Sequence, residues 1–220
     1  MSLNQWFHSN AGLPVNKWTH YLPIYERYFQ PFVNRRINFL EIGSGQGGSS
    51  RMWKQYFGPA ALIVTIDVRE ECRAFEEEQV KVRIGDQSDP VFLQSLIDEF
   101  GAFDILLDDG SHNMRHVNAT FDYMYPRMAR DAVYMVEDLH TSYLEGWEGG
   151  LRREGTFFEH VKSLIDELHA HYTNGALPET EFGKMTRAIH IYDSIAVFEK
   201  GQFLIKQPRS IPFIPDQTIW

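Results

Sequence analysis

The feature that most constrains the fold is a cluster of glycines directly after a short apolar run. Residues Ile37–Ile42 read as a buried strand, and the glycine cluster Gly43–Gly48 follows at once. The next segment, 50–57, carries its large apolar residues on one helical face. Glycines at such a turn allow a tight backbone and the close approach of a ligand. The pattern predicts a ligand-binding strand–loop–helix unit.

Further apolar runs alternate with helical patterns along the chain. Strands are predicted over 61–68, 80–84, 103–107, 132–136, 188–192 and 194–199, and helices over 17–32, 89–100, 114–124 and 156–172. This alternation is typical of a doubly wound α/β fold, with a parallel sheet between two layers of helices. In such sheets ligands bind beyond the carboxyl ends of the strands.

Composition limits the class of partner. The length of 220 residues suits one α/β domain, and 21 Lys and Arg against 30 Asp and Glu give a net charge of −9. An acidic chain is a poor match for a nucleic-acid backbone or an anionic membrane. The single cysteine, Cys72, excludes an intramolecular disulfide. We therefore expect a cytoplasmic protein with no nucleic-acid and no membrane partner.

We divide the chain into three parts. Residues 1–35 form an N-terminal helical segment, 36–200 form the ligand-binding catalytic domain, and 201–220 form an extended tail. The tail contains prolines and several apolar residues, so we expect it to cover the surface or a second copy of the chain. A homo-oligomer is therefore a candidate state.

Two features favour S-adenosylmethionine over NAD as the ligand of the glycine loop. Glu41 lies two residues before the first glycine, where a carboxylate suits the cationic methionine portion and suits a pyrophosphate poorly. Asp86 and Gln87 end the third strand, where a polar pair can read the amino edge of adenine. The predicted cofactor-binding residues are Glu41, Gly43, Gly45, Gly47, Asp67, Asp86, Gln87 and Asp108. NAD binding and an ordinary polar turn remain alternatives.

Two acidic doublets follow the fourth and fifth predicted strands. They are Asp108-Asp109 and Glu137-Asp138. Adjacent strands would bring Asp109, Glu137 and Asp138 to one cleft, where a divalent cation relieves their mutual repulsion. An oxygen-rich site suits Mg²⁺, with Mn²⁺ or Ca²⁺ as alternatives. The other interpretation is that these acids cap helices or pair with nearby arginines.

A histidine follows each doublet. His112 lies three residues after Asp109, and the usual pKa of imidazole suits a general base. His140 is a second candidate on the acceptor side. The glycine-containing loop that holds Tyr143 and Trp147 is interpreted as a lid, with a solvated loop as the alternative.

Five motifs together resemble a known enzyme family. They are EIGSGQGGSS, TIDVR, IGDQSDP, DILLDDGSH and MVEDLHTSY. They resemble the metal-dependent sugar O-methyltransferases of macrolide biosynthesis, of the mycinamicin VI and demethylmacrocin type, over about residues 17–199. Enzymes of the mycinamicin type carry an additional N-terminal domain, so the resemblance covers the catalytic domain and leaves the acceptor open.

The resemblance implies a class I methyltransferase fold with an antiparallel last strand. It implies S-adenosylmethionine as methyl donor, Mg²⁺ bound by Asp109, Glu137 and Asp138, and His112 as the base. It also implies that Tyr21, Tyr25 and Glu26 border the active site, which makes them candidate substrate residues with His140, Tyr143 and Trp147.

The expected reaction is metal-assisted methylation of a hydroxyl on a sugar or a glycosylated natural product. One alternative is the same fold acting on a phenolic or other small acceptor, in the manner of cephalosporin-hydroxylase-like or catechol enzymes. An NAD-dependent oxidoreductase and a non-catalytic cofactor-binding module are further alternatives. In every enzymatic case but the oxidoreductase, the partner is a small molecule that carries a hydroxyl group.

Overall fold

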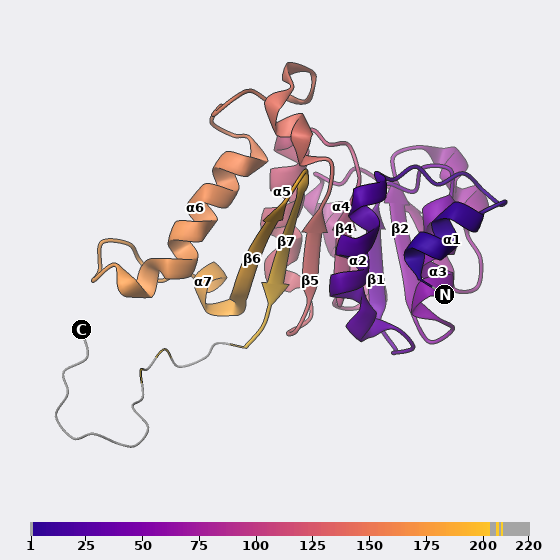
Figure 1. The fold of residues 1–220 in the computed structure, drawn as a ribbon, viewed down its shortest axis with the longest axis horizontal. Helices are drawn as coiled ribbons and strands as arrows, with labels where there is room; N and C mark the ends of the chain where they lie inside the picture. The colour runs from indigo at the N-terminus through magenta and orange to yellow at the C-terminus, as the bar shows by residue number, and fades with distance from the viewer. Residues whose placement is uncertain (1, 203–205, 207, 209–220) are drawn as a thin grey trace.

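The structure is a computed structural model that describes residues 2–202, 206 and 208. Seven strands form one mixed sheet in the order β3-β2-β1-β4-β5-β7-β6 (Figure 1). Strands β1 to β5 pair in parallel, and β7 runs antiparallel to both β5 and β6. The expected doubly wound sheet with an antiparallel last strand is confirmed.

The elements follow the predicted order. The strands are β1 Asn38–Ile42, β2 Leu62–Asp67, β3 Val80–Ile84, β4 Ile105–Asp108, β5 Val133–Val136, β6 Thr186–Tyr192 and β7 Ile195–Lys200. The α-helices are α1 Leu3–Ser9, α2 Leu22–Phe29, α3 Gly48–Phe57, α4 Pro90–Phe100, α5 Met114–Met124, α6 Phe157–His169 and α7 Glu181–Met185. Three of the short 3₁₀ turns bear on the site: η1 Thr19–Tyr21, η5 Leu139–Tyr143 and η6 Glu145–Trp147.

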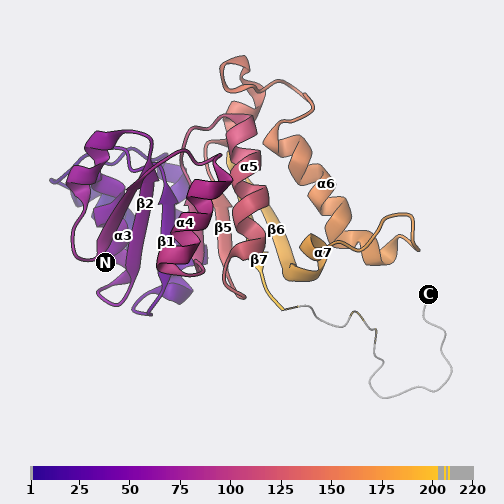
Figure 2. The same ribbon diagram turned by 180° about the vertical axis from the view of Figure 1, so that it is seen from behind.

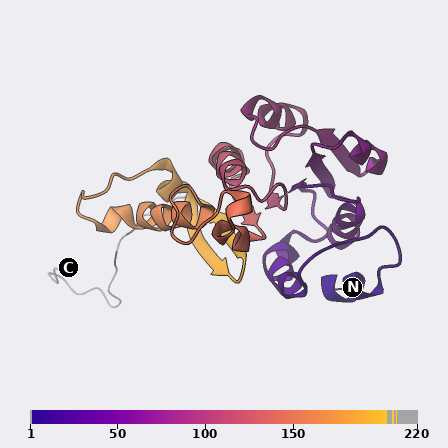
Figure 3. The same ribbon diagram turned by 90° about the horizontal axis from the view of Figure 1, so that it is seen from above.

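Two apolar layers cover the two faces of the sheet. Successive strand residues point to opposite faces, so Phe39 joins the cluster under α1, α2 and α3, while Leu40 joins the cluster under α4, α5 and α6. Figures 1 and 2 show these two groups of helices on opposite sides of the sheet. From above, α6 projects away from the half that carries α1 and α3 (Figure 3).

The N-terminal segment is more divided than the predicted helix over 17–32. Lys17 lies in extended chain, η1 and α2 follow, and α1 was not predicted. Tyr25 and Phe29 of α2 pack on Trp53 of α3, with ring centroids 5.3 and 5.6 Å apart. The segment therefore shares the core of the sheet, and the boundary between residues 35 and 36 remains a prediction.

A close contact fixes the path of this segment. A Cβ atom at Gly48 would clash with the backbone carbonyls of Leu13 and Pro14. The chain before Lys17 therefore crosses directly over the first turn of α3, which only a glycine permits.

Two other expectations concern the chain ends and the bilayer. Most of the predicted tail, 201–220, lies outside the described residues. The expected homo-oligomer, which was argued from this tail, therefore stays a prediction. Within the described part of the chain, no helix has the length and apolar character needed to cross a bilayer.

Candidate active site

A cavity of approximately 390 Å³ lies beyond the carboxyl ends of β1, β2 and β3. Its lining includes five of the predicted cofactor-binding residues, together with Asp109: Gly43, Gly45, Asp67, Asp86 and Gln87. Gly43 has φ 98°, and a Cβ there would clash with the carbonyl of Asp109. The tight turn thus brings the loop after β4 against the loop after β1.

Two basic residues, Arg69 and His116, are among the lining residues of this cavity that were not predicted from the sequence. The Arg69 Nε and backbone N–H both donate to Oδ1 of Asp67 at 3.0 Å. Partial burial acts to raise the pKa of Asp67, but the hydrogen bonds and charge of Arg69 outweigh it and hold that pKa below its usual value. Asp67 is therefore an anion at the point where β2 ends, and Arg69 fixes its orientation.

Gln87 and Asp108 form a buried support under the cavity. The Gln87 amide nitrogen lies 3.2 Å from each Asp108 oxygen, and its carbonyl accepts from the Ser111 N–H at 2.7 Å. Burial raises the pKa of the Asp108 carboxyl to about 7. These contacts join the ends of β3 and β4, and Asp108 lies beneath the cavity, outside its lining.

Glu41 and Gly47 also lie outside the lining of the cavity. Glu41 is completely buried and accepts from Trp53 Nε1 at 2.9 Å and Ser49 Oγ at 2.7 Å. Its nearest cation is the Lys17 ammonium at 3.6 Å. The structure therefore gives Glu41 an internal partner where we expected it to meet the ligand. Gly47 packs under the ring of Phe75.

Three predicted residues converge next to this cavity. One side-chain ligand atom each from Asp109, His112 and Asp138 lies within 4.8 Å of the other two. His112 Nε2 is 3.5 Å from Asp138 Oδ2 and 3.7 Å from Asp109 Oδ1. All three side chains are only about one-fifth exposed, at 20%, 23% and 21%. The carboxylate oxygens of this cluster are donors that can hold a hard divalent cation, and the imidazole lies beside them.

The backbone is strained at two of these residues. His112 has φ 55° and Asp138 has φ 57°, both in the left-handed region. Non-glycine residues are uncommon there, at a cost of about 1–3 kcal/mol, and they concentrate at functional sites. In this conformation the two side chains face one another, with His112 Nε2 3.5 Å from Asp138 Oδ2.

The third predicted metal ligand, Glu137, is engaged by protein donors. Its Oε1 lies 2.9 Å from the Lys17 ammonium, and its Oε2 accepts from the hydroxyl of Tyr25. Burial, and next the charge of Asp109, raise the pKa of Glu137 well above its usual range. Because the negative charge of Asp109 contributes to this raised pKa, additional positive charge at the site would favour the carboxylate form of Glu137.

Lys17 is a further site residue that was not predicted from the sequence. Its ammonium also contacts Oδ2 of Asp109, and its side chain is 1% exposed. Burial acts to lower the pKa of Lys17, but the charges of Asp109, Glu137 and Glu41 outweigh it and raise that pKa. No local pattern signals this role, because Lys17 lies in extended chain and its partners are 92 and 120 positions away.

The three candidate substrate residues of the N-terminal segment separate. The Tyr21 hydroxyl donates to Asp138 Oδ1 at 2.8 Å, and Tyr25 donates to Glu137. Both tyrosines are completely buried, so they contact the acidic cluster from behind. Glu26 lies elsewhere, where its carboxylate accepts from the Leu3 N–H and borders a hollow with Trp6 and Tyr56.

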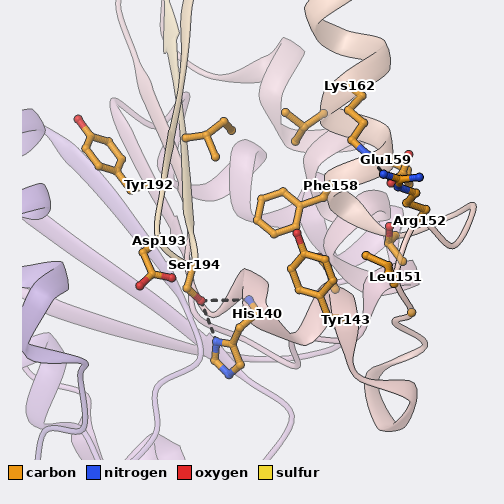
Figure 4. A pocket seen from close by; sticks show the side chains of 15 residues that line it. His140, Tyr143, Leu151, Arg152, Phe158, Glu159, Lys162, Tyr192, Asp193 and Ser194 are labelled. Carbon is orange, nitrogen blue, oxygen red and sulfur yellow. Dashed lines mark hydrogen bonds and ion pairs between the residues drawn. The ribbon is translucent and has the colours of Figure 1, made fainter.

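A second hollow of approximately 470 Å³ opens beside His140, between α6 and the β6–β7 turn. Figure 4 shows His140 bonded to Ser194 at its floor and the rings of Tyr143 and Phe158 on one wall. Those two ring centroids are 5.7 Å apart. His140 Nδ1 lies 3.9 Å from Asp138 Oδ1, so the hollow begins one side chain away from the acidic cluster.

The predicted lid has a compact structure. Residues 139–147 form the turns η5 and η6, and the N–H groups of Gly149 and Gly150 donate back to Leu144 and Ser142. Trp147 is 40% exposed and lies outside the lining of the hollow beside His140. Gly149 and Gly150 therefore serve packing in the described conformation, which gives no support to the lid interpretation.

Several known proteins are similar to this chain in sequence. No known family model matches the chain. The 8-demethyl-8-alpha-L-rhamnosyl tetracenomycin-C 2'-O-methyltransferase of Streptomyces olivaceus is 36% identical over 206 residues, which cover 86% of this chain and 54% of the relative. The mycinamicin VI 2''-O-methyltransferase of Micromonospora griseorubida is 34% identical over 195 residues, which cover 83% of this chain and 48% of the relative.

Solved structures agree with the sequence relatives. The methyltransferase MycE of mycinamycin biosynthesis, in complex with Mg, SAH and mycinamycin VI, superposes with a TM-score of 0.80 at 29% identity, over 96% of this chain and 56% of MycE. The O-methyltransferase TomG of Streptomyces achromogenes, at 15% identity and a TM-score of 0.54, shares the fold alone. The chain spans about half the length of the curated relatives it matches. By sequence and by fold, this chain is therefore a relative of the sugar O-methyltransferases of glycosylated natural products.

Proposed function

We propose that this chain transfers a methyl group from S-adenosylmethionine to a hydroxyl on the sugar of a glycosylated small molecule, with Mg²⁺ assistance. One observation carries the proposal: Asp109 lines the cavity beyond the glycine loop and also belongs to the cluster with His112 and Asp138. A methyl donor in that cavity and an acceptor at that cluster would be neighbours. The rhamnosyl and mycinamicin O-methyltransferases named above give the class of acceptor.

The acidic cluster fits a magnesium ion. Asp109, Asp138 and Glu137 supply oxygen ligands. Three carboxylates of the neighbourhood, those of Asp109, Glu137 and Glu41, face the one buried ammonium of Lys17. A bound Mg²⁺ would lower the pKa of a coordinated hydroxyl and fix its oxygen in place. The residues that would hold it are Asp109, Glu137 and Asp138.

His112 is the proposed general base. During the reaction a carbon–oxygen bond forms, the carbon–sulfur bond of the sulfonium breaks, and the hydroxyl proton must leave. His112 Nε2 faces the two aspartates at 3.5 and 3.7 Å, so a hydroxyl held between them would lie within reach of the imidazole. The products are the methyl ether, S-adenosylhomocysteine and a proton taken up by His112.

The cavity beyond the glycine loop is the proposed donor site. Asp67, held as an anion by Arg69, is placed to accept hydrogen bonds from ribose hydroxyls. Asp86 lines the cavity and is the remaining candidate for reading adenine, because the amide of Gln87 is already bonded to Asp108 and Ser111. Gly43 and Gly45 let the loop backbone approach the ligand.

The hollow beside His140 is the proposed place for the part of the acceptor beyond the methylated sugar. Its lining combines the apolar side chains of Tyr143, Leu151 and Phe158 with the charged groups of Arg152 and Asp193. A site of mostly apolar surface with a few polar groups is typical of small-molecule pockets. Phe158 and Tyr143 would contact the aglycone.

The deciding experiment is calorimetric titration of the full chain with S-adenosylmethionine and S-adenosylhomocysteine, in excess Mg²⁺ and in EDTA. We expect both ligands to bind, and methyl transfer to a panel of simple rhamnosides and related sugar diols to require the metal. Folded protein that binds neither ligand would contradict the proposal. Transfer to catechols with none to the sugars would favour a phenolic acceptor instead.

A further inference from the structure

The three carboxylates of the proposed metal site share one arrangement. Each has at least one oxygen bonded to a donor from the segment 17–25, and Glu137 has both of its oxygens bonded in this way. Tyr21 donates to Oδ1 of Asp138, Tyr25 to Oε2 of Glu137, and Lys17 contacts both Oδ2 of Asp109 and Oε1 of Glu137. For the two aspartates, the other oxygen is the one that faces His112.

We propose that Lys17, Tyr21 and Tyr25 are positioning residues of the metal centre, which set the oxygen that each aspartate presents to the cation and fix the orientation of the Glu137 carboxylate. The inference rests on the proposed function, since it assumes that a cation binds there. Donors behind metal-binding groups orient them, and their loss typically weakens metal affinity about 10–100-fold. The segment 17–25 thus contacts the aspartate oxygens that do not face His112.

The burial of these side chains separates this role from substrate binding. Tyr21 and Tyr25 are 0% exposed, and Lys17 is 7% exposed. Their donor groups are bonded to carboxylates, so these side chains have no free donor with which to bind the methyl-acceptor molecule. Lys17 also lies 3.6 Å from Glu41, whose other partners, Trp53 and Ser49, belong to α3. One ammonium therefore connects the ends of β1, β4 and β5.

Helix α2 provides a matched control. Tyr28 lies on the same helix as Tyr25, but its hydroxyl is 2.8 Å from the hydroxyl of Tyr192 on β6 and meets no carboxylate. Tyr→Phe at positions 21, 25 and 28 removes one hydroxyl in each case and keeps the ring. Only the first two changes remove a donor to the acidic cluster.

The test is Mg²⁺ titration by calorimetry, with Mn²⁺ as a paramagnetic probe, on the full chain and on the three variants. We expect Tyr21→Phe and Tyr25→Phe to weaken Mg²⁺ binding about tenfold or more. Tyr28→Phe should bind Mg²⁺ like the parent, and all three should bind S-adenosylhomocysteine within about twofold of it. If Tyr25→Phe fails to fold, Tyr21→Phe carries the test. The Asp138 carboxylate is 21% exposed, so the folded protein depends less on the hydrogen bond that Tyr21 donates to it.

Two outcomes would overturn the inference, and they differ. If the parent binds Mg²⁺ and the 21 and 25 variants bind it as Tyr28→Phe does, the hydroxyls are structural only and the proposed function stands. If the folded parent binds no Mg²⁺, the metal-assisted reaction fails together with the inference. Lys17→Met adds a test of sign: weaker binding supports positioning, whereas tighter binding would show that the ammonium competes with the metal.

Discussion

The Lys17 ammonium lies 2.9 Å from Oε1 of Glu137, and the two side chains are only 1% and 2% exposed. The same ammonium contacts Asp109 and is 3.6 Å from Glu41. A buried charge is tolerated when it is paired and hydrogen-bonded, and removal of one partner leaves the others uncompensated. The acidic end of this sheet therefore depends on a residue that precedes the first strand by about twenty positions.

We expect Lys17→Met to destabilise the protein by about 3–5 kcal/mol, because it leaves buried carboxylates without their cation. Urea unfolding in the presence of EDTA measures the change. Lys54→Met is the control, since Lys54 pairs with Glu77 at 3.0 Å on the surface, where both are more than one-third exposed. Its effect should be within about 0–1 kcal/mol. Equal losses in the two variants would show that Lys17 is not a buried counter-ion.

Asp138→Asn should remove Mg²⁺ binding and metal-dependent transfer while the fold persists. The asparagine can still accept from Tyr21, and asparagine tolerates the left-handed conformation at this position. Calorimetry and an assay with EDTA addition and Mg²⁺ rescue measure both effects. Asp131 is the exposed ion-pair partner of Arg187, and Asp131→Asn is the control that should change neither Mg²⁺ binding nor methyl transfer. Full activity of the parent in excess EDTA would refute the metal requirement.

His112→Ala should lower kcat by about 10²–10⁴-fold, the usual contribution of a positioned base, with S-adenosylhomocysteine affinity nearly unchanged. Because His112 has φ 55°, His112→Gly should be about 1 kcal/mol more stable than His112→Ala and equally inactive. Thermal unfolding and single-turnover assays separate the two effects. Loss of ligand binding in a folded His112→Ala protein would rule out the role as base.

Leu151→Ser should weaken acceptor binding without a cost in stability. Leu151 lines the hollow beside His140 and is 79% exposed, so the folded protein gains little from it. We expect a KM raised several-fold for an acceptor with a large apolar aglycone and an unchanged KM for the methyl glycoside of the same sugar. Leu177→Ser, at an exposed position outside that lining, is the control. A parent enzyme that treats both acceptors alike would contradict the assignment of the hollow.

The sequence predicted the parts of the molecule that depend on local pattern. Apolar runs gave the strands to within a few residues, and the rule that parallel strands end at one edge brought Asp109 and Asp138 together. Lys17 was missed because its partners are 92 and 120 positions away, and no local pattern encodes that contact.

Neighbouring residues show the same limit at finer scale. Tyr25 and Glu26 were predicted together, but successive helix residues point about 100° apart, and only Tyr25 faces the acidic cluster. The carboxylate of Glu41 was expected to face a ligand, and its burial followed from the packing of Trp53, which the sequence places only on a helix face. Tertiary contacts decided both cases.

The N-terminal segment crosses over the first turn of α3 at Gly48. A Cβ at Gly48 would clash with the carbonyls of Leu13 and Pro14, both of them backbone atoms that cannot move without shifting the chain toward Lys17. Gly48→Ala should therefore weaken Mg²⁺ binding as well as stability, because the displaced segment no longer holds Lys17 against Asp109 and Glu137. Calorimetry and urea unfolding measure the pair of effects. Gly146→Ala, where the added Cβ meets open space, should leave both unchanged. A Gly48→Ala protein with parental Mg²⁺ affinity would show that the segment adapts at this crossing and that Lys17 is held by other contacts.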